Sequence, residues 1–283
     1  MKLLASRLRR IPIGGLFGGA IVLFWIAMVL LGARVAPHDA GEIVDMDVFL
    51  PASAQFPFGT DYLGRDMLSR VLHGARYTVG IALAAALIAS GSGLILGMVA
   101  AVRRGWLDAV LSRALDTLIS IPSKMFALIV VAAFGSSIPV LVLMAGTIYT
   151  PGAYRIARSL AVGVGAQDFV RVAEARGEGT GFIVREEILP NIIGPVLADF
   201  GLRFVFIVLL LAGMSFLGLG IQPPNADWGS LVRENMAGLY EGAPAVLMPA
   251  LAIASLTIGM NLAIDALGGR DALGGRRRSG EAG

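Results

Sequence analysis

Long apolar runs without a charged side chain alternate with shorter polar segments along this chain. A helix that crosses about 30 Å of hydrocarbon needs about 20 apolar residues, so each long run predicts a membrane-spanning helix. The charge-free run 125–154 is too long for one comfortable crossing, and the Gly-Ser-Ser-Ile-Pro sequence at 135–139 predicts a turn that divides it. Six spans are therefore predicted, at 13–33, 77–102, 118–134, 139–154, 198–219 and 244–264.

These spans predict an all-α integral membrane protein. The first run is longer than the roughly 7–15 residue core of a signal peptide, which indicates a retained anchor helix. We expect a tail at 1–12, the anchor helix at 13–35, an outer loop at 36–76, a five-helix core at 77–265 and a second tail at 266–283. Most of the 23 Lys and Arg residues fall on the side that holds both tails, and that side is normally the cytoplasm.

Composition agrees with the membrane assignment. Hydrophobic residues make up 56% of the chain and charged residues 15%, whereas about 25% charged residues is usual in a soluble domain. The absence of cysteine excludes a secreted disulfide scaffold. The net charge of +3 comes from basic residues spread over several inner segments with few aromatics between them, so we do not expect nucleic-acid binding.

Two kinds of chemistry are excluded by residue supply. A phosphate-binding P-loop needs Gly-x-x-x-x-Gly-Lys-Ser/Thr, and neither Lys2 nor Lys124 stands in that pattern. A zinc site is poorly served by a chain that has no cysteine and only two histidines, His38 and His73, both expected in the outer loop. We therefore expect no catalytic, cofactor-binding or metal-binding residue on this chain.

The inner loop at about 155–197 is far longer than two neighbouring helices need, and long ordered loops are usually functional. Asp168 is expected to cap a short amphipathic helix that Gly177, Gly179 and Gly181 interrupt. Thr180 is expected to start a second short helix, which Pro190 ends. Such a helix is suited either to docking into a groove on another protein or to lying in the lipid interface, and the chemistry favours neither.

This loop resembles the ATPase-docking motif of binding-protein-dependent ABC importer permeases, written as Glu-Ala-Ala, three residues, Gly, nine residues, Ile, one residue, Leu-Pro. Ala173, Gly177, Leu189 and Pro190 fit that register, whereas Arg171 stands where the Glu is expected. The resemblance implies an ATPase-docking loop whose candidate residues are Phe169, Val170, Arg171, Val172, Ala173, Glu174, Arg176, Gly177, Leu189 and Pro190.

Three further stretches resemble permeases of the dipeptide, oligopeptide and nickel type. They are Phe-Gly-Thr-Asp-Tyr-Leu-Gly-Arg-Asp at 58–66 with the basic positions that follow it to 76, Ile-Leu-Pro-Asn at 188–191, and Ser-Phe-Leu-Gly-Leu-Gly at 215–220 with Pro-Pro at 223–224 and Asp-Trp-Gly at 227–229. The resemblance extends over 58–265, most of the chain, and the motifs are specific when taken together.

Membership of that family implies a six-helix bundle like those of type I ABC importer permeases. It also implies a second homologous permease subunit, two ATPase subunits that hold ATP and magnesium, and an extracytoplasmic substrate-binding protein. The location would be a bacterial or archaeal cell membrane. Peptides are the expected cargo, with nickel chelates or glutathione as alternatives, and the residues that contact substrate are not identified by sequence.

Two other classes of membrane protein predict different sequence features. A secondary carrier would show an internal repeat and broken or charged helices at mid-membrane, and an intramembrane enzyme would need a nucleophile and a base within its spans. Asp199 and Arg203 stand four residues apart at the inner end of the fifth span, where an i,i+4 pair and snorkelling explain them. The Pro151-Gly152 sequence predicts a kink in the fourth span, which either lines the path or serves packing.

Overall fold

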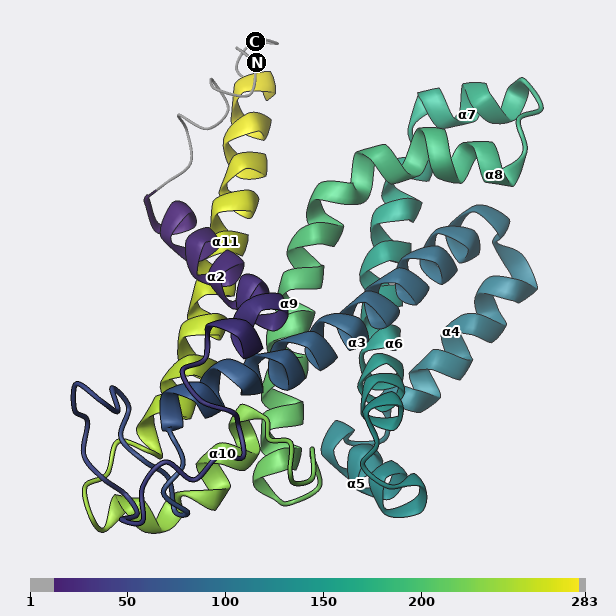
Figure 1. Ribbon diagram of the computed structural model, residues 1–283. Helices are drawn as coiled ribbons and strands as arrows, with labels where there is room; N and C mark the ends of the chain where they lie inside the picture. The colour runs from purple at the N-terminus through teal and green to yellow at the C-terminus, as the bar shows by residue number, and fades with distance from the viewer. Residues whose placement is uncertain (1–12, 280–283) are drawn as a thin grey trace.

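The computed structural model describes residues 13–279, with side chains up to Ala266, and every regular element in that part of the chain is a helix. Figure 1 shows long helices crossing one another and a compact loop region at the lower left. In chain order the elements are α2 (Ile13–Val35), α3 (Met67–Arg103), α4 (Gly105–Ile119), α5 (Ser123–Phe134), α6 (Ile138–Gly165), α7 (Asp168–Ala175), α8 (Thr180–Phe182), the π-helical turn η1 (Ile183–Ile188), α9 (Leu189–Phe216), α10 (Trp228–Glu234), the 3₁₀ turn η2 (Met236–Leu239) and α11 (Leu247–Ser279).

Among the residues that the structure describes, four helices are long and apolar enough to cross a membrane: α2, α3, the continuous helix 180–216 that contains α9, and α11 up to Ala266. A fifth crossing is counted if the bent pair α4 and α5 forms one span. The structure thus confirms the all-α membrane class. By length and apolar composition, the described residues contain four or five membrane-spanning helices rather than the expected six. The helix outside the count is α6, which has Arg155 and Arg158 in its second half.

The predicted span 118–134 is wrong as a single straight helix. The chain breaks between Ile119 and Ser123, and α4 and α5 meet there at 84°. Pro122 explains the break, because proline has no N–H for the helical ladder and disfavours helical backbone at the residue before it. The predicted turn at 135–139 is present, since α5 ends at Phe134 and α6 begins at Ile138.

Three other boundaries differ from expectation. α3 begins at Met67, inside the expected outer loop, because the Asp66 side chain accepts a hydrogen bond from the Ser69 N–H and caps the helix. α6 runs on to Gly165, so the inner segment that joins α6 to α9 covers 166–188 rather than about 155–197. α11 continues to Ser279, into the expected second tail, and the expected first tail at 1–12 lies outside the described residues.

The helices pack closely where small residues remove steric bulk. A Cβ added at Gly93 would lie 2.4 Å from the Ala153 Cβ, and one at Gly97 would lie 2.8 Å from the Tyr154 carbonyl oxygen, so α3 and α6 are in backbone contact. Gly18 of α2 approaches the Gly259 carbonyl of α11 in the same way. Gly18, Gly93 and Gly97 therefore let helix backbones approach closely within this chain.

Candidate functional site

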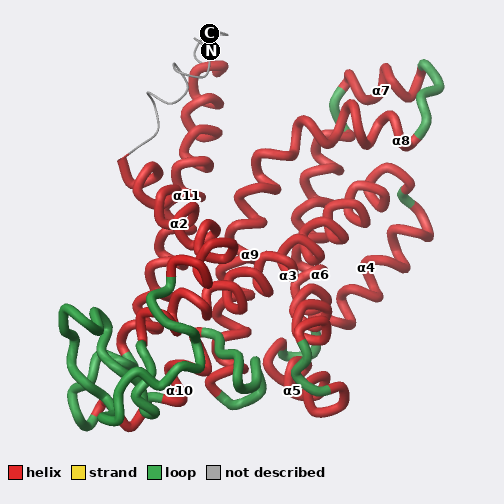
Figure 2. Tube along the Cα trace, in the orientation of Figure 1, coloured by secondary structure: helices red, strands yellow, loops and turns green. Residues whose placement is uncertain are grey.

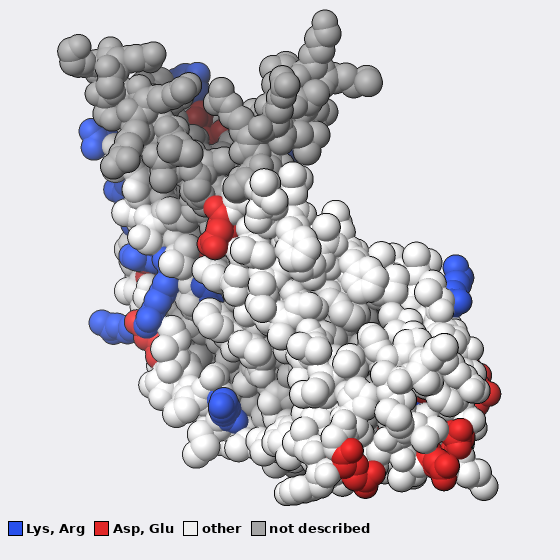
Figure 3. All heavy atoms as spheres, turned by 90° about the vertical axis from the view of Figure 1, so that its left-hand side faces the viewer, with Lys and Arg blue, Asp and Glu red and all other residues white. Residues whose placement is uncertain are grey.

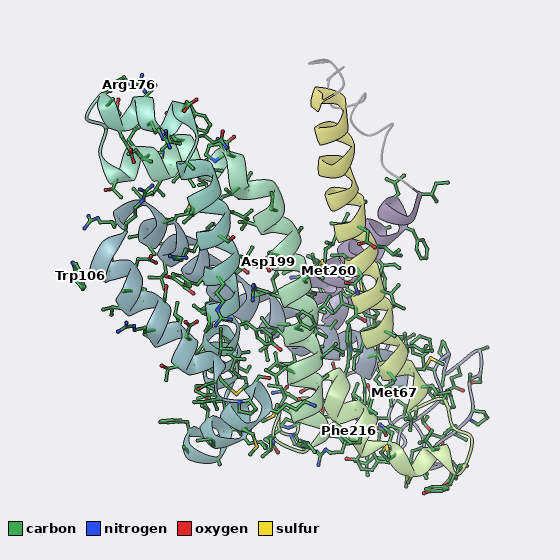
Figure 4. The ribbon with its side chains drawn as sticks, turned by 180° about the vertical axis from the view of Figure 1, so that it is seen from behind. Met67, Trp106, Arg176, Asp199, Phe216 and Met260 are labelled. Atoms are coloured by element: carbon green, nitrogen blue, oxygen red, sulfur yellow. The ribbon has the colours of Figure 1, made fainter. Side chains whose placement is uncertain are left out.

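The candidate docking segment projects from one end of the helix bundle. α7, α8 and η1 form a helical hairpin at the end opposite α10, with its turn drawn as a loop in Figure 2. Figure 4 places Arg176 at the tip of this projection. Only Ala166 and Gln167 separate α6 from α7, and η1 continues directly into α9, so both sides of the hairpin are fastened to long helices.

The first helix of the hairpin ends in a Schellman motif. The Glu178 N–H bonds to the Ala173 carbonyl at 3.2 Å, and the Gly177 N–H bonds to the Glu174 carbonyl at 2.9 Å. Gly177 adopts φ +80°, which favours glycine because it has no Cβ. Gly177 therefore interrupts the helix as predicted, whereas Gly181 lies inside α8 and interrupts nothing.

Two other local predictions need correction. Gln167, not Asp168, is the N-cap of α7, and Asp168 is the first helical residue, where its negative charge still favours the helix dipole. Pro190 does not end a helix, because it lies in the first turn of α9. The turn before it is a π-helix, in which the Leu189 N–H bonds to the Val184 carbonyl, so a proline at the next position is accommodated.

One face of α7 is anchored in a hydrophobic cluster. Val170 is 1% exposed and Ala173 is fully buried. Val170 packs with Ile183 and Ile188 of η1 and with apolar side chains from three long helices. Those side chains are Met98 and Ala101 of α3, Ala161 of α6, and Ile192 and Val196 of α9. The hairpin is therefore joined to three helices of the bundle by apolar packing.

The opposite face of α7 is open. Phe169 is 43% exposed and Val172 is 56% exposed, although both are apolar. Arg171, Glu174 and Arg176 are also exposed, and none of them forms an ion pair within residues 13–266. The candidate residues thus separate into an anchored set and an exposed set, with Leu189 half-buried and Pro190 exposed at the start of α9.

At the other end of the molecule, the first of the family-like stretches forms a buried ionic network. Asp61 is fully buried, and its Oδ2 accepts hydrogen bonds from Arg65 Nε at 2.7 Å and Arg70 Nη1 at 2.6 Å. Arg70 Nη2 also donates to Glu234 Oε2 of α10 at 3.1 Å. The Tyr62 N–H donates to the Asn235 side chain at 3.0 Å. This network fastens the outer loop to α10.

The last family-like stretch, at 215–229, packs at the same end of the molecule, around the start of α10. Asp227 caps α10 through the Ser230 N–H and accepts a hydrogen bond from the Ser215 hydroxyl at 2.6 Å. Burial raises the pKa of the Asp227 carboxyl, and its hydrogen bonds act in the opposite direction. The Trp228 indole N–H donates to the Val71 carbonyl at 2.9 Å, and the ring packs edge-on against Trp25. Sequence reasoning identified these stretches separately, and the structure brings them together.

The predicted pair Asp199 and Arg203 is present, but Arg203 does not snorkel. Its Nε donates to Asp199 Oδ2 at 2.6 Å, while its Nη1 donates to the Tyr149 carbonyl of α6 at 3.1 Å. Arg203 is 9% exposed, and Figure 4 shows Asp199 on α9 within the bundle. A Cβ at Gly152 would lie 2.6 Å from Arg203 Nη1, so the predicted Pro151-Gly152 feature makes room for this guanidinium.

Charged side chains are unevenly distributed on the surface. On the face shown in Figure 3 they are sparse across the middle, and Asp and Glu gather at the end where the outer loop lies. The exposed apolar side chains of α2 include Leu16, Phe17, Leu23 and Leu30. No group of three His, Cys, Asp or Glu side chains suited to a metal ion occurs in the described part of the chain.

The fold and its surface define a multi-pass helical membrane protein. Residues 93–270 match the family model described as the binding-protein-dependent transport system inner membrane component, and the chain belongs to this family of permease subunits. It is 32% identical to the dipeptide transport system permease protein DppC of Alkalihalophilus pseudofirmus, over 93% of this chain and 86% of that protein. It is 30% identical to the glutathione transport system permease protein GsiD of Pectobacterium atrosepticum, over 92% and 86%.

A solved structure of an amino acid ABC transporter with histidines is also similar, with 18% identity and a TM-score of 0.48 over 71% of this chain and 92% of that one.

Proposed function

We propose that this permease subunit forms part of a path for peptide-like solutes and is driven by separate ATPase subunits that grip α7. The observation that carries the proposal is the division of α7 into two faces. Val170 packs against the bundle and Ala173 is fully buried, while the apolar side chains of Phe169 and Val172 are exposed. An exposed apolar strip with flanking charges is the surface expected of a helix that lies in a groove of another protein.

In this proposal ATP and magnesium bind to the partner chains, and this chain performs no catalysis. Both termini and the α7 hairpin lie on the cytoplasmic side, and the outer loop meets a substrate-binding protein on the other side. A second homologous permease completes the path. The short link between α6 and α7 lets movement of the hairpin pass directly to a long helix, which can bias two global states of the bundle.

Peptides are the proposed cargo because relatives that match almost the full chain carry names for dipeptide, di/tripeptide and glutathione transport. These solutes share a peptide backbone with charged termini. Nickel transport remains the alternative from sequence resemblance, and no described feature favours it.

The docking assignment is tested by charge reversal in the assembled transporter. Arg171→Glu combined with Val172→Asp is expected to lower both ATP-dependent uptake and solute-stimulated ATPase activity about tenfold or more, because a central interface contact is lost. Arg185→Glu is the matched control, since Arg185 is 83% exposed on η1 and pairs only with the adjacent Glu186. Full uptake and ATPase stimulation in the double variant would remove α7 as the docking helix.

A further inference from the structure

Two ion pairs join α4 to α6. Arg155 Nη2 donates to Asp116 Oδ1 at 2.5 Å, and Arg155 Nε donates to the same oxygen at 3.2 Å. Arg158 forms a second, two-bonded pair with Asp108. The two pairs differ in exposure: both side chains of the Arg155–Asp116 pair are 54% exposed, whereas Asp108 is only 19% exposed.

The exposed pair lies beside the apolar run of α3, one of the helices long and apolar enough to cross a membrane. Close contacts of Gly93 with Ala153 and of Gly97 with the Arg158 N–H place residues 153–158 of α6 beside residues 93–97 of α3. That part of α3 precedes the end of its apolar run by several residues. Arg155 itself lies ten residues, or about 15 Å, before the end of α6. Charged side chains within a membrane-crossing segment face protein or a water-filled path rather than lipid.

The break between α4 and α5 lies in the same region, where α4 packs beside α6; we call this region the α4–α6 seam. Backbone at residues 120–122 leaves the helical ladder, and open backbone groups are not tolerated against hydrocarbon. A cavity of about 240 Å³ lies at this break, lined by apolar side chains of α4, α5 and α6 and by three hydroxyl-bearing residues, Ser123, Thr147 and Tyr149. Its lining includes no charged side chain. Both the charged pair and the open backbone are features that favour a surface facing protein or water over one facing lipid.

The cavity and the Arg155–Asp116 pair lie along the same faces of α4 and α6. Ile148 lines the cavity and precedes Arg155 by seven residues, which is two helical turns, so both side chains lie on the same face of α6. Ile119 of the cavity follows Asp116 by one turn of α4. The separation along α6 is about 10 Å, comparable with the length of an extended dipeptide or tripeptide.

We propose that the α4–α6 seam is a solute-binding site on the translocation path. This inference rests on the proposed transport of peptide-like solutes. The site takes a short peptide with a free carboxylate: the carboxylate accepts hydrogen bonds from Arg155 in place of Asp116, the peptide extends along the shared face of α6, and one apolar side chain enters the cavity. The cavity is smaller than the roughly 300–1,000 Å³ of a site that encloses a whole drug-sized ligand, which suits a single side chain.

The first test is water access in the assembled transporter. The chain has no cysteine, so Thr147→Cys introduces its only thiol. We expect a membrane-impermeant thiol reagent to label this position and the dipeptide Leu-Leu to slow the labelling. Ala145→Cys is the matched control on the same helix, because Ala145 is fully buried and should not react. No labelling of Thr147→Cys would mean that lipid or the partner permease covers the seam, and would overturn the site.

The second test asks whether Arg155 binds the carboxylate. In the Thr147→Cys background, Arg155→Gln should raise the Leu-Leu concentration needed for half-protection about tenfold, as expected for a lost hydrogen bond to a charged group. It should not change protection by Leu-Leu amide, which has no carboxylate. Arg113→Gln, at an exposed α4 position, is the control and should leave both values unchanged.

The outcomes separate this site from the proposed function. If the wild-type transporter imports Leu-Leu but the Arg155 variant shows unchanged protection by both ligands, the site is overturned and the transport function stands. If the wild-type transporter imports no dipeptide and labelling is unaffected by Leu-Leu, the proposed cargo and the site both fall. An equal loss of protection by Leu-Leu and its amide would show a structural role for Arg155 and also overturn the site.

Discussion

Arg203 joins two helices through one guanidinium group. It pairs with Asp199 on its own helix and donates to the Tyr149 carbonyl on α6, and both contacts are largely hidden from solvent. A buried arginine needs several partners because an unpaired charge is costly to bury. Gly152 permits the contact, since any side chain at that position would meet the guanidinium.

Gly152→Ala is therefore expected to destabilise the protein by about 1–2 kcal/mol, through loss of the hydrogen bond from Arg203 to the Tyr149 carbonyl. Thermal unfolding of the purified protein in one detergent measures the effect. Gly163→Ala is the matched control in α6, because a Cβ there meets no atom within 4 Å and alanine favours a helix. Equal unfolding temperatures for the two variants would contradict this role of Gly152.

Asp61 is a second single residue on which stability depends, in this case the stability of the outer loop. Asp61→Asn removes the carboxylate charge that both Arg65 and Arg70 meet, and leaves the buried Arg70 with Glu234 as its remaining charged partner. We expect a loss of about 3–5 kcal/mol, the usual cost of breaking a buried ion pair from one side. Asp47→Asn, at an exposed position of the same loop, should change the unfolding free energy by less than about 0.5 kcal/mol. A similar result for both variants would show that the network contributes little.

Sequence could identify Asp61, Arg70 and Trp228 as members of recognisable stretches, but not the contacts between them. Asp61 and Glu234 meet through Arg70 across more than 160 positions. A single sequence contains no signal for such a pairing, because local periodicity reports only neighbours along one helix. The pair of Asp199 and Arg203 was predictable, because the two residues stand four positions apart on one helix.

At the scale of elements, α7 depends on its C-terminal turn. Gly177→Ala is expected to weaken the helix by about 1–2 kcal/mol, because the position has φ +80° and a Cβ is disfavoured there. Hydrogen exchange of the α7 amides should become roughly 5–30-fold faster. Gly179→Ala is the control, since Gly179 has φ −74° and open space around it. Unchanged exchange in Gly177→Ala would contradict the Schellman motif.

The bend between α4 and α5 is expected to depend on Pro122. Pro122→Ala removes a penalty of about 3 kcal/mol against continuous helix, so the 84° bend should open. Spin labels at Val110 and Ile129, both exposed, report the change as a longer distance between the two helices. Pro139→Ala should have no effect, because that proline lies in the first turn of α6. An unchanged distance in Pro122→Ala would assign the bend to tertiary packing instead.

The position of a helix was predictable from sequence where a long apolar run determines it. The boundary of a helix was not predictable where it depends on a polar partner from another helix. The runs in α2, α3, α9 and α11 predicted their spans. The prediction for α6 ended near Tyr154 because Arg155 and Arg158 looked like inner-loop residues. In the structure Asp116 and Asp108 on α4 pair with them and allow the helix to continue. Charge alone could not reveal partners that lie about 40–50 positions away.

At the scale of the whole molecule, two specialised ends are joined by a helical bundle. The α7 hairpin packs on α3, α6 and α9 at one end, and the Asp61 network fastens the outer loop to α10 at the other. Between these ends, α3 and α6 are in close backbone contact. Rigid helices between two attachment points can transmit a displacement from one to the other, which an ATP-driven permease requires.

The family membership was predictable from motifs spread over most of the chain, because several short patterns in the right order are specific together. The solute site was not, because it depends on a bend and on pairing between α4 and α6 that no local pattern encodes. The candidate docking residues were predicted as one set, and only three-dimensional packing separates those that are buried from those left exposed.

The most direct test of the central claim is dipeptide uptake into vesicles that contain the complete transporter and its binding protein. We predict uptake only when ATP is supplied and the ATPase subunits can hydrolyse it, with no dependence on an ion gradient. Uptake that continues with hydrolysis-deficient ATPase subunits, and that stops when the ion gradient is collapsed, would contradict the claim that this chain is a path driven by a separate motor.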